Sequence, residues 1–267
     1  MISDVVLRRI KSLPPLPKSV TEVQRITSNP NSSIKDLINV IKEDPLMTAN
    51  LLKVANSPLY GFSRKIKTID QAIALFGMST VKGFVISFAI RNTLKFDLSA
   101  YGIDENRFHE IALKRNALGI NWYKKDREKL DIISTNSFLI DIGAVIISLV
   151  LVSERRAEEF REELKRENRY KVELKYIGGT TAEVTAEVFK HWRFSNDLVE
   201  SMANIDMPSK SEKYFEYAAA LKVLRSALDL LKDDANSKDR AIELIKKYNL
   251  DQASFIEAWN IVMEGGK

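Results

Sequence analysis

The sequence contains no cysteine and only two histidines, His109 and His191, among its 267 residues. Without cysteine the chain cannot form a disulfide framework, a thiolate zinc site, an iron–sulfur cluster or a cysteine nucleophile. The absence of cysteine also fits a reducing compartment, where disulfides are rare. Two histidines are too few for a histidine-rich metal centre.

A long hydrophobic segment is lacking as well. The longest apolar stretch, residues 138–152, is interrupted by Asp141 and is shorter than the ~20 residues that a membrane-spanning helix needs. Residues 1–9 lack the basic start and the long apolar run of a signal peptide. We therefore expect a soluble, cytoplasmic protein with no membrane partner, and we interpret residues 138–152 as a core helix.

Several common catalytic motifs are also missing. The chain has no glycine-rich phosphate loop, no dinucleotide-binding fingerprint and no G-x-S-x-G nucleophile elbow. It has no helix-turn-helix or zinc-finger spacing, and no segment repeats at a fixed period. These absences argue against a P-loop enzyme, a dinucleotide-dependent enzyme and a solenoid fold.

Helical periods and helix caps recur along the chain, while alternation with a period of two is rare. Residues 33–36 and 180–183 have the pattern of helix-starting caps. Asp44 followed by Pro45 is typical of another helix start, and Gly77 is typical of a helix end. The sequence therefore predicts an all-α fold.

The predicted helices fall into two lobes. Residues 97–104, which include Ser99 and Gly102, have the composition of a lobe boundary. We expect an N-terminal helical lobe over residues 1–97 and a C-terminal helical lobe over residues 98–267. Within the second lobe, the charged residues 154–166 are expected to form a helix that touches the body only through a thin apolar stripe.

Positive charge is concentrated in the first half of the chain. The net charge is +5, but residues 1–130 hold 21 Lys and Arg against 12 Asp and Glu, and the remainder holds 20 against 24. Such an asymmetry would attract an anionic partner to the first half. The alternative is two solvated surfaces that differ in composition.

Three motifs are more distinctive than composition. They are LPPLP at residues 13–17, EDPLMT running into ANSPLYG at residues 43–61, and IDQAIALFG at residues 69–77. In this order and spacing they resemble the N-terminal signature of the HDOD family, a catalytically altered offshoot of the HD phosphohydrolases. The resemblance covers residues 13–208. It implies a compact multi-helix fold, with the signature motifs in the first lobe, a degenerate HD-like second lobe, and a role in bacterial signal transduction.

The same resemblance indicates that catalysis has been lost. HD phosphohydrolases use a His, a His-Asp dyad and a further Asp around divalent metal, which activates water and neutralises phosphate charge. The dyad aligns with Ile140 and Asp141, so the aspartate is kept while the histidine is replaced by an alkyl side chain that has no lone pair. We expect no catalytic residue, no bound metal and no cofactor.

Asp141, His109 and Glu110 occupy the positions of the former metal site. His109 or Glu110 falls near the place of the first ligand histidine, and together with the carboxylate oxygens of Asp141 either could hold one cation. We expect instead that Asp141 is a buried relic, hydrogen-bonded to a polar group such as Arg115 or Asn116 on the neighbouring helix.

The residues just after the ANSPLYG turn, together with Tyr60 inside it, are a candidate partner-binding site. They combine aromatic with basic side chains: Tyr60, Phe62, Arg64, Lys65 and Lys67. Such a set could meet an acidic protein surface, or it could bind nucleic acid through phosphate contacts and base stacking. The plainer interpretation is a solvated loop.

Together these patterns favour a non-catalytic signalling or regulatory module that binds a protein partner or a small signalling molecule. Two alternatives remain open at this point. One is a residual metal-dependent phosphohydrolase with an incomplete ligand set. The other is a nucleic-acid-binding regulator that uses the basic first half. The sequence does not determine the oligomeric state.

Overall fold

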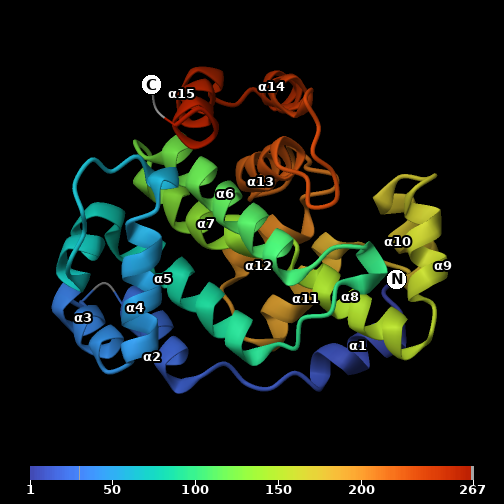
Figure 1. Ribbon diagram of the computed structural model, residues 1–267, viewed down its shortest axis with the longest axis horizontal. Helices are drawn as coiled ribbons and strands as arrows, with labels where there is room; N and C mark the ends of the chain where they lie inside the picture. Colours follow the sequence, from blue (N-terminus) through green and yellow to red (C-terminus); the bar gives the residue numbers. More distant parts are fainter. Residues whose placement is uncertain (30, 266–267) are drawn as a thin grey trace. The chain divides into compact units, whose positions relative to one another are not determined.

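The computed structural model describes residues 1–29 and 31–265. Within these ranges the chain forms helices and connecting loops and no strand (Figure 1), which confirms the predicted all-α fold. The helices, including the 3-10 helices η1 and η2, are α1 (Asp4–Lys11), α2 (Lys18–Ser28), α3 (Ile34–Lys42), α4 (Pro45–Ala55), η1 (Pro58–Tyr60), α5 (Ile69–Thr93), η2 (Ser99–Tyr101), α6 (Glu105–Tyr123), α7 (Arg127–Leu139), α8 (Ile142–Ser153), α9 (Ala157–Leu164), α10 (Arg169–Ile177), α11 (Thr181–His191), α12 (Asn196–Ala203), α13 (Phe215–Ala227), α14 (Ser237–Tyr248) and α15 (Gln252–Met263).

The predicted helix signals act as expected. Ser33 and Thr180 each cap a helix through a reciprocal capping box with the acidic residue three positions later. Asp44 caps α4, in which Pro45 takes the first position. Gly77 has φ 79° and ψ 164°, so it breaks α5 into two helical segments at the predicted place.

Residue contacts divide the chain into two units, each built from three segments. Unit 1 comprises Met1–Pro14, Lys95–Arg115 and Leu139–Leu250, and unit 2 comprises Pro15–Leu94, Asn116–Phe138 and the segment that begins at Asp251. The predicted lobes, residues 1–97 and 98–267, are continuous segments and stay a prediction, whereas both units are discontinuous.

In unit 2, the helix α5 packs against α2, α3 and α4. An aromatic cluster forms part of the core: the ring of Tyr60 lies 5.0 Å from that of Phe76, and Phe84 lies 5.1 Å from Phe76 and 5.2 Å from Phe138. These pairs meet edge to face, the arrangement that aromatic quadrupoles favour. The signature motifs at residues 43–61 and 69–77, which supply Tyr60 and Phe76, therefore contribute to a packed core.

In unit 1, α11 packs against α8 and α12, and α13 packs against α14 (Figure 1). The approach of α8 to α11 depends on Gly143, because a Cβ there would lie 2.3 Å from the Thr181 carbonyl oxygen. The Gly143 amide instead donates to the Thr185 hydroxyl at 2.9 Å. This close contact fixes the start of α8.

The prediction of one core helix over residues 138–152 was wrong. The helix α7 ends at Leu139 and α8 begins at Ile142, with Ile140 and Asp141 between them. Asp141 has φ −104° and ψ 15° and occupies the N-cap position of α8. Its carboxylate is held by ion pairs with arginine side chains, described below. Asp141 was the one polar residue in this part of the apolar run, and the sequence did not show that the helix ends there.

Two helical stretches, Ile69–Thr93 and Arg127–Ser153, are long and apolar enough to cross a membrane by length and composition alone. However, 61% of the most apolar window of the first stretch and 89% of that of the second are buried inside the protein. The first is broken at Gly77 and the second at Asp141. Such burial is typical of core helices.

Candidate functional site

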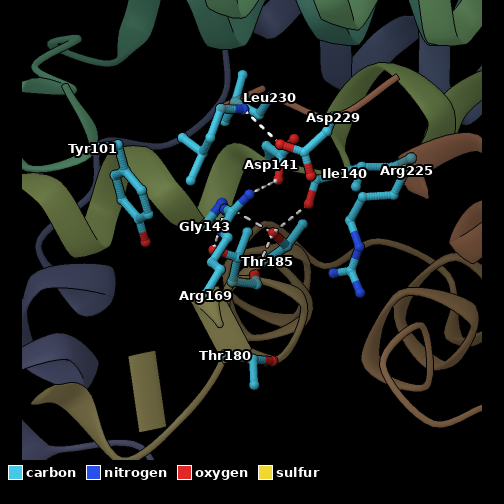
Figure 2. A network of polar contacts seen from close by, with 12 residues as sticks. Tyr101, Ile140, Asp141, Gly143, Arg169, Thr180, Thr185, Arg225, Asp229 and Leu230 are labelled. Atoms are coloured by element: carbon cyan, nitrogen blue, oxygen red, sulfur yellow. Dashed lines mark hydrogen bonds and ion pairs between the residues drawn. The ribbon is translucent and has the colours of Figure 1, made fainter. Parts of the chain in front are cut away.

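The break between α7 and α8 places the carboxylate of Asp141 inside unit 1, where 2% of its side chain is exposed. The NH1 group of Arg115 donates to Asp141 Oδ2 in a fully buried ion pair. Arg169 NH1 lies 3.1 Å from Asp141 Oδ1 (Figure 2). Each oxygen of the carboxylate therefore faces a guanidinium group, Oδ2 through a hydrogen bond with Arg115 and Oδ1 through an ion pair with Arg169. The predicted bond between Asp141 and Arg115 is confirmed.

The two arginines determine the ionisation of Asp141. Burial alone raises the pKa of this carboxyl, but the charges of Arg115 and Arg169 outweigh it and lower the pKa to about 2. Burial lowers the pKa of Arg115 from its ordinary value, an effect opposed by Asp141. Asp141 is thus a fixed anion whose counterions are protein side chains.

Arg115 and Arg169 are themselves held in position. Arg115 Nε donates to the Leu228 carbonyl oxygen at 2.7 Å. Arg169 donates to Glu173 at 2.7 Å and to the Thr181 hydroxyl at 2.6 Å. This cluster is a connected network of buried polar groups. Two of its buried atoms, Arg115 NH2 and Asp141 Oδ1, form no hydrogen bond with any described residue.

Glu173 links Arg169 to further members of this network. Its carboxylate accepts bonds from the Tyr101 hydroxyl at 2.8 Å and from the Thr181 backbone amide at 2.6 Å. The guanidinium of Arg169 lies over the Tyr101 ring at 5.0 Å. Burial, and then the neighbouring Glu173, raise the pKa of Tyr101 well above its usual range, so this phenol stays protonated.

The structure places His109 and Glu110 in other surroundings. His109 Nε2 lies 3.0 Å from Glu105 Oε1, and Glu110 pairs at the surface with Lys114. On an ideal helix, the side chain of His109 points about 120° away from that of Arg115 around the helix axis, and the side chain of Glu110 points about 140° away from it. No group of three His, Asp or Glu side chains suited to a metal ion occurs among residues 1–29 and 31–265.

The other histidine has a structural contact. His191 Nε2 lies 3.2 Å from the Leu13 carbonyl oxygen, and the indole of Trp192 donates to the Pro14 carbonyl oxygen at 3.1 Å. These side chains hold the first part of the LPPLP motif against the end of α11. Asn116, the second candidate partner of Asp141, instead belongs to unit 2, where its Oδ1 accepts from the Tyr60 hydroxyl at 2.9 Å.

A cleft of about 400 Å3 opens beside this network in unit 1. The cleft lies within the size range of small-molecule sites. Its cationic lining side chains are Arg169, Lys222, Arg225, Lys232 and Arg240, and its carboxylates are Glu173, Asp206, Asp229 and Asp234. Arg169 and Glu173 are shared between the cleft and the Asp141 network, so the cleft lies next to the remnant of the dyad.

Arg225 and Lys222 extend into this cleft from α13. Arg225 NH2 donates to the carboxylate of Asp206, whose other oxygen accepts from the Thr180 hydroxyl at 2.6 Å. Lys222 Nζ donates to the Asp206 backbone carbonyl oxygen. Burial, followed by the charge of Arg225, lowers the pKa of Lys222 from its ordinary value. Two cationic side chains, Arg225 and Lys222, therefore lie close together in the inner part of the cleft.

The HDOD family model matches residues 13–208, nearly three quarters of the sequence. The chain belongs to the HDOD family. The family match includes the N-terminal motifs, the Ile140–Asp141 break and Arg169, and it ends before α13.

This HDOD chain is similar to several known proteins. A Treponema pallidum (strain Nichols) protein is 28% identical over 87 residues, which are 33% of this chain and 17% of that relative. A structure described as a candidate phosphohydrolase from Shewanella amazonensis SB2B has a TM-score of 0.73 and 22% identity, covering 99% of this chain and 96% of its own. A candidate signal transduction protein from Marinobacter aquaeolei VT8 has a TM-score of 0.70 and 18% identity, covering 96% and 58%.

The predicted partner-binding segment of the HDOD chain needs one correction. Tyr60 is 5% exposed and belongs to the core of unit 2, so it cannot contact a partner at the surface. Phe62 is 37% exposed and meets Phe76 edge to face, with ring centroids 5.1 Å apart. The three cations Arg64, Lys65 and Lys67 are exposed. We call residues 62–67 the basic loop.

Sequence reasoning missed the cleft. Its two inner cations lie three residues apart on α13, a helix otherwise rich in buried alanine and leucine. A pair of cations at i and i+3 inside such an apolar helix was the available signal. Arg169 carried no comparable signal, because it lies in a run of charged residues.

Proposed function

We propose that this HDOD chain is a non-catalytic signalling module that acts by binding. The observation that supports it is the pairing of Asp141, the remaining half of the dyad, with two arginines. Ile140 supplies no metal ligand, and both oxygens of Asp141 face guanidinium groups. The positive charge that a metal would supply at this point comes from the protein itself.

Electrostatics argues against a metal at the same carboxylate. A divalent cation bound to Asp141 would lie about 4 Å from the Arg115 guanidinium. At the effective dielectric constant of about 20 that suits protein sites, the repulsion is about 8 kcal/mol. Moving Arg115 aside would leave a buried charge without a partner, which is also costly. The two arginines therefore compete with a metal ion for the Asp141 carboxylate, which supports a role without metal-dependent hydrolysis.

The wider setting of this function is also a proposal. One solved relative is described as a candidate signal transduction protein and another as a candidate phosphohydrolase. The pairing of Asp141 with two arginines favours the first description for this chain. We infer a bacterial, cytoplasmic regulator, for which the basic loop is a contact site for an acidic protein partner.

Turnover assays test this function. Purified protein is incubated with Mn2+ and with a panel of nucleotides, cyclic dinucleotides and a chromogenic phosphodiester, and product is measured against a buffer blank. We expect no turnover above the blank. Turnover that disappears in a folded Asp141→Asn variant, and persists in the matched surface variant Glu110→Gln, would show that the chain is an enzyme.

A further inference from the structure

The cleft beside the Asp141 network has a surplus of hydrogen-bond donors. Its four carboxylates are engaged: Glu173 by Tyr101, Thr181 and Arg169, and Asp206 by Arg225 and Thr180. Asp229 accepts from two backbone amides, and Asp234 pairs with Arg240. The acceptors of the cleft are thus largely used within the protein.

Fewer of the hydrogen-bond donors of the cleft have partners within the protein. A guanidinium has five N–H donors and an ammonium has three. In the described part of the chain, Arg225 directs one hydrogen bond to Asp206, and Lys222 directs one to a backbone carbonyl. Lys232 is exposed and lines the cleft, and its charge acts on Asp234, which already pairs with Arg240. A ligand that supplies several acceptor oxygens would complete these donors.

The charge on α13 favours an anion. Arg225 pairs with the carboxylate of Asp206, whereas Lys222 donates to the backbone carbonyl oxygen of the same residue and is half-buried. Burial and Arg225 together lower the pKa of Lys222, which means that its charged form is poorly compensated. An anion beside Lys222 would stabilise the charged form of its ammonium group. Phosphate is suited to the role because it offers three acceptor oxygens and up to two negative charges.

The cleft also has a non-polar side. Tyr170 lies on its lining with 36% of the residue exposed, and Leu244 contributes an apolar wall. An exposed aromatic ring is a stacking platform for a flat heteroaromatic group. A ligand with a phosphate at one end and a flat ring at the other would use both features.

We propose that this cleft binds a nucleoside phosphate, with the phosphate at Lys222 and Arg225 and the base at Tyr170. This inference deepens the proposed function, since it names the class of signal that the module would bind. The ligand would be bound without being hydrolysed. Arg169, which lines the cleft and also holds Asp141, would link the occupied cleft to the buried network.

Isothermal titration calorimetry on the full chain tests the site. The probes are ADP, GDP, CDP and UDP, with inorganic phosphate and adenosine as half-ligands. We expect at least one nucleoside diphosphate to bind with one-to-one stoichiometry and more tightly than either half-ligand. Lys222→Met should weaken that binding by about tenfold or more, the size expected for loss of a charge-assisted hydrogen bond. Tyr170→Ala should weaken it more than Tyr170→Phe.

Matched surface variants keep the test decisive even if Lys222→Met does not fold. Lys232→Glu reverses a charge at the cleft rim, and Lys210→Glu reverses an exposed lysine of the same unit that does not line the cleft. We expect weaker binding in the first and unchanged binding in the second. No binding of any of the four diphosphates at millimolar concentration, or equal binding by both variants, would overturn the proposal.

Chromatography of the ligand after titration separates this inference from the proposed function. A ligand recovered intact agrees with both. Binding followed by hydrolysis would support the cleft while contradicting a non-catalytic role. Absence of binding would contradict the cleft and leave the proposal of a non-catalytic Asp141 site unaffected.

Discussion

Neutralising Asp141 should destabilise the protein by an amount that its ion pairs determine. The pKa of this buried carboxyl is lowered from 3.8 to about 2. A shift of that size corresponds to about 2 kcal/mol of extra stability for the ionised over the protonated form. Asparagine resembles the protonated acid in shape, so Asp141→Asn should lower the free energy of unfolding by about 2 kcal/mol.

Arg115→Met should cost more, about 3–5 kcal/mol, because it leaves a buried carboxylate with one of its two counterions. Since both changes remove the same ion pair, the double variant should cost less than the two single costs combined. We expect a coupling free energy of about 1 kcal/mol or more, within the range seen for contacting residues.

The assay is urea unfolding followed by circular dichroism for the wild type, both single variants and the double variant. The matched control is Glu110→Gln, which removes an exposed pair with Lys114 and should change stability by less than about 0.5 kcal/mol. Additive single costs, or an Asp141→Asn variant as stable as the control, would refute the buried ion pair as the organising feature of this network.

Three further predictions concern other parts of the structure. Because the pKa of Asp141 is depressed, the stabilisation from its ionised form is fully present above pH 4 and is lost as the pH falls through about 2. Urea midpoints measured from pH 5 to pH 2 should therefore fall less steeply in Asp141→Asn than in the wild type. Gly143→Ala should lower the free energy of unfolding by about 1–3 kcal/mol, because the added Cβ would lie 2.3 Å from a carbonyl oxygen of α11. A variant with an unchanged urea midpoint would show that α8 is free to shift. Reversing the three cations of the basic loop to glutamate should leave the circular dichroism spectrum unchanged and weaken capture of protein partners. Capture by the wild type should decline as added salt shortens the Debye length from about 10 Å to about 3 Å. Equal capture by the variant and the wild type at every salt concentration would identify a solvated loop.

The parts of the fold that depend on local signals were predictable from sequence. The caps at Ser33, Asp44 and Thr180 and the break at Gly77 each involve residues within a few positions of one another. Their geometry is therefore encoded in short patterns. The family motifs added the expected fold class, and the structure confirms it.

The site was only partly predictable, because its partners are distant in sequence. Asp141 and Arg115 were identified as a candidate pair, but Arg169 reaches the same carboxylate from α10. The break at Asp141 lies within an apolar run that reads as one helix. Tyr60 was assigned to the surface because it precedes basic residues, although packing against Phe76 places it in the core.

The most direct test of the central claim is the metal content of the protein. The wild type is dialysed separately against Mn2+, Fe2+ and Zn2+, passed over a desalting column, and measured by elemental analysis together with Asp141→Asn. Because two guanidinium groups occupy the Asp141 carboxylate, we predict far less than one equivalent of each metal, with no difference between wild type and variant. One equivalent of metal in the wild type that is lost in a folded Asp141→Asn variant would contradict the account.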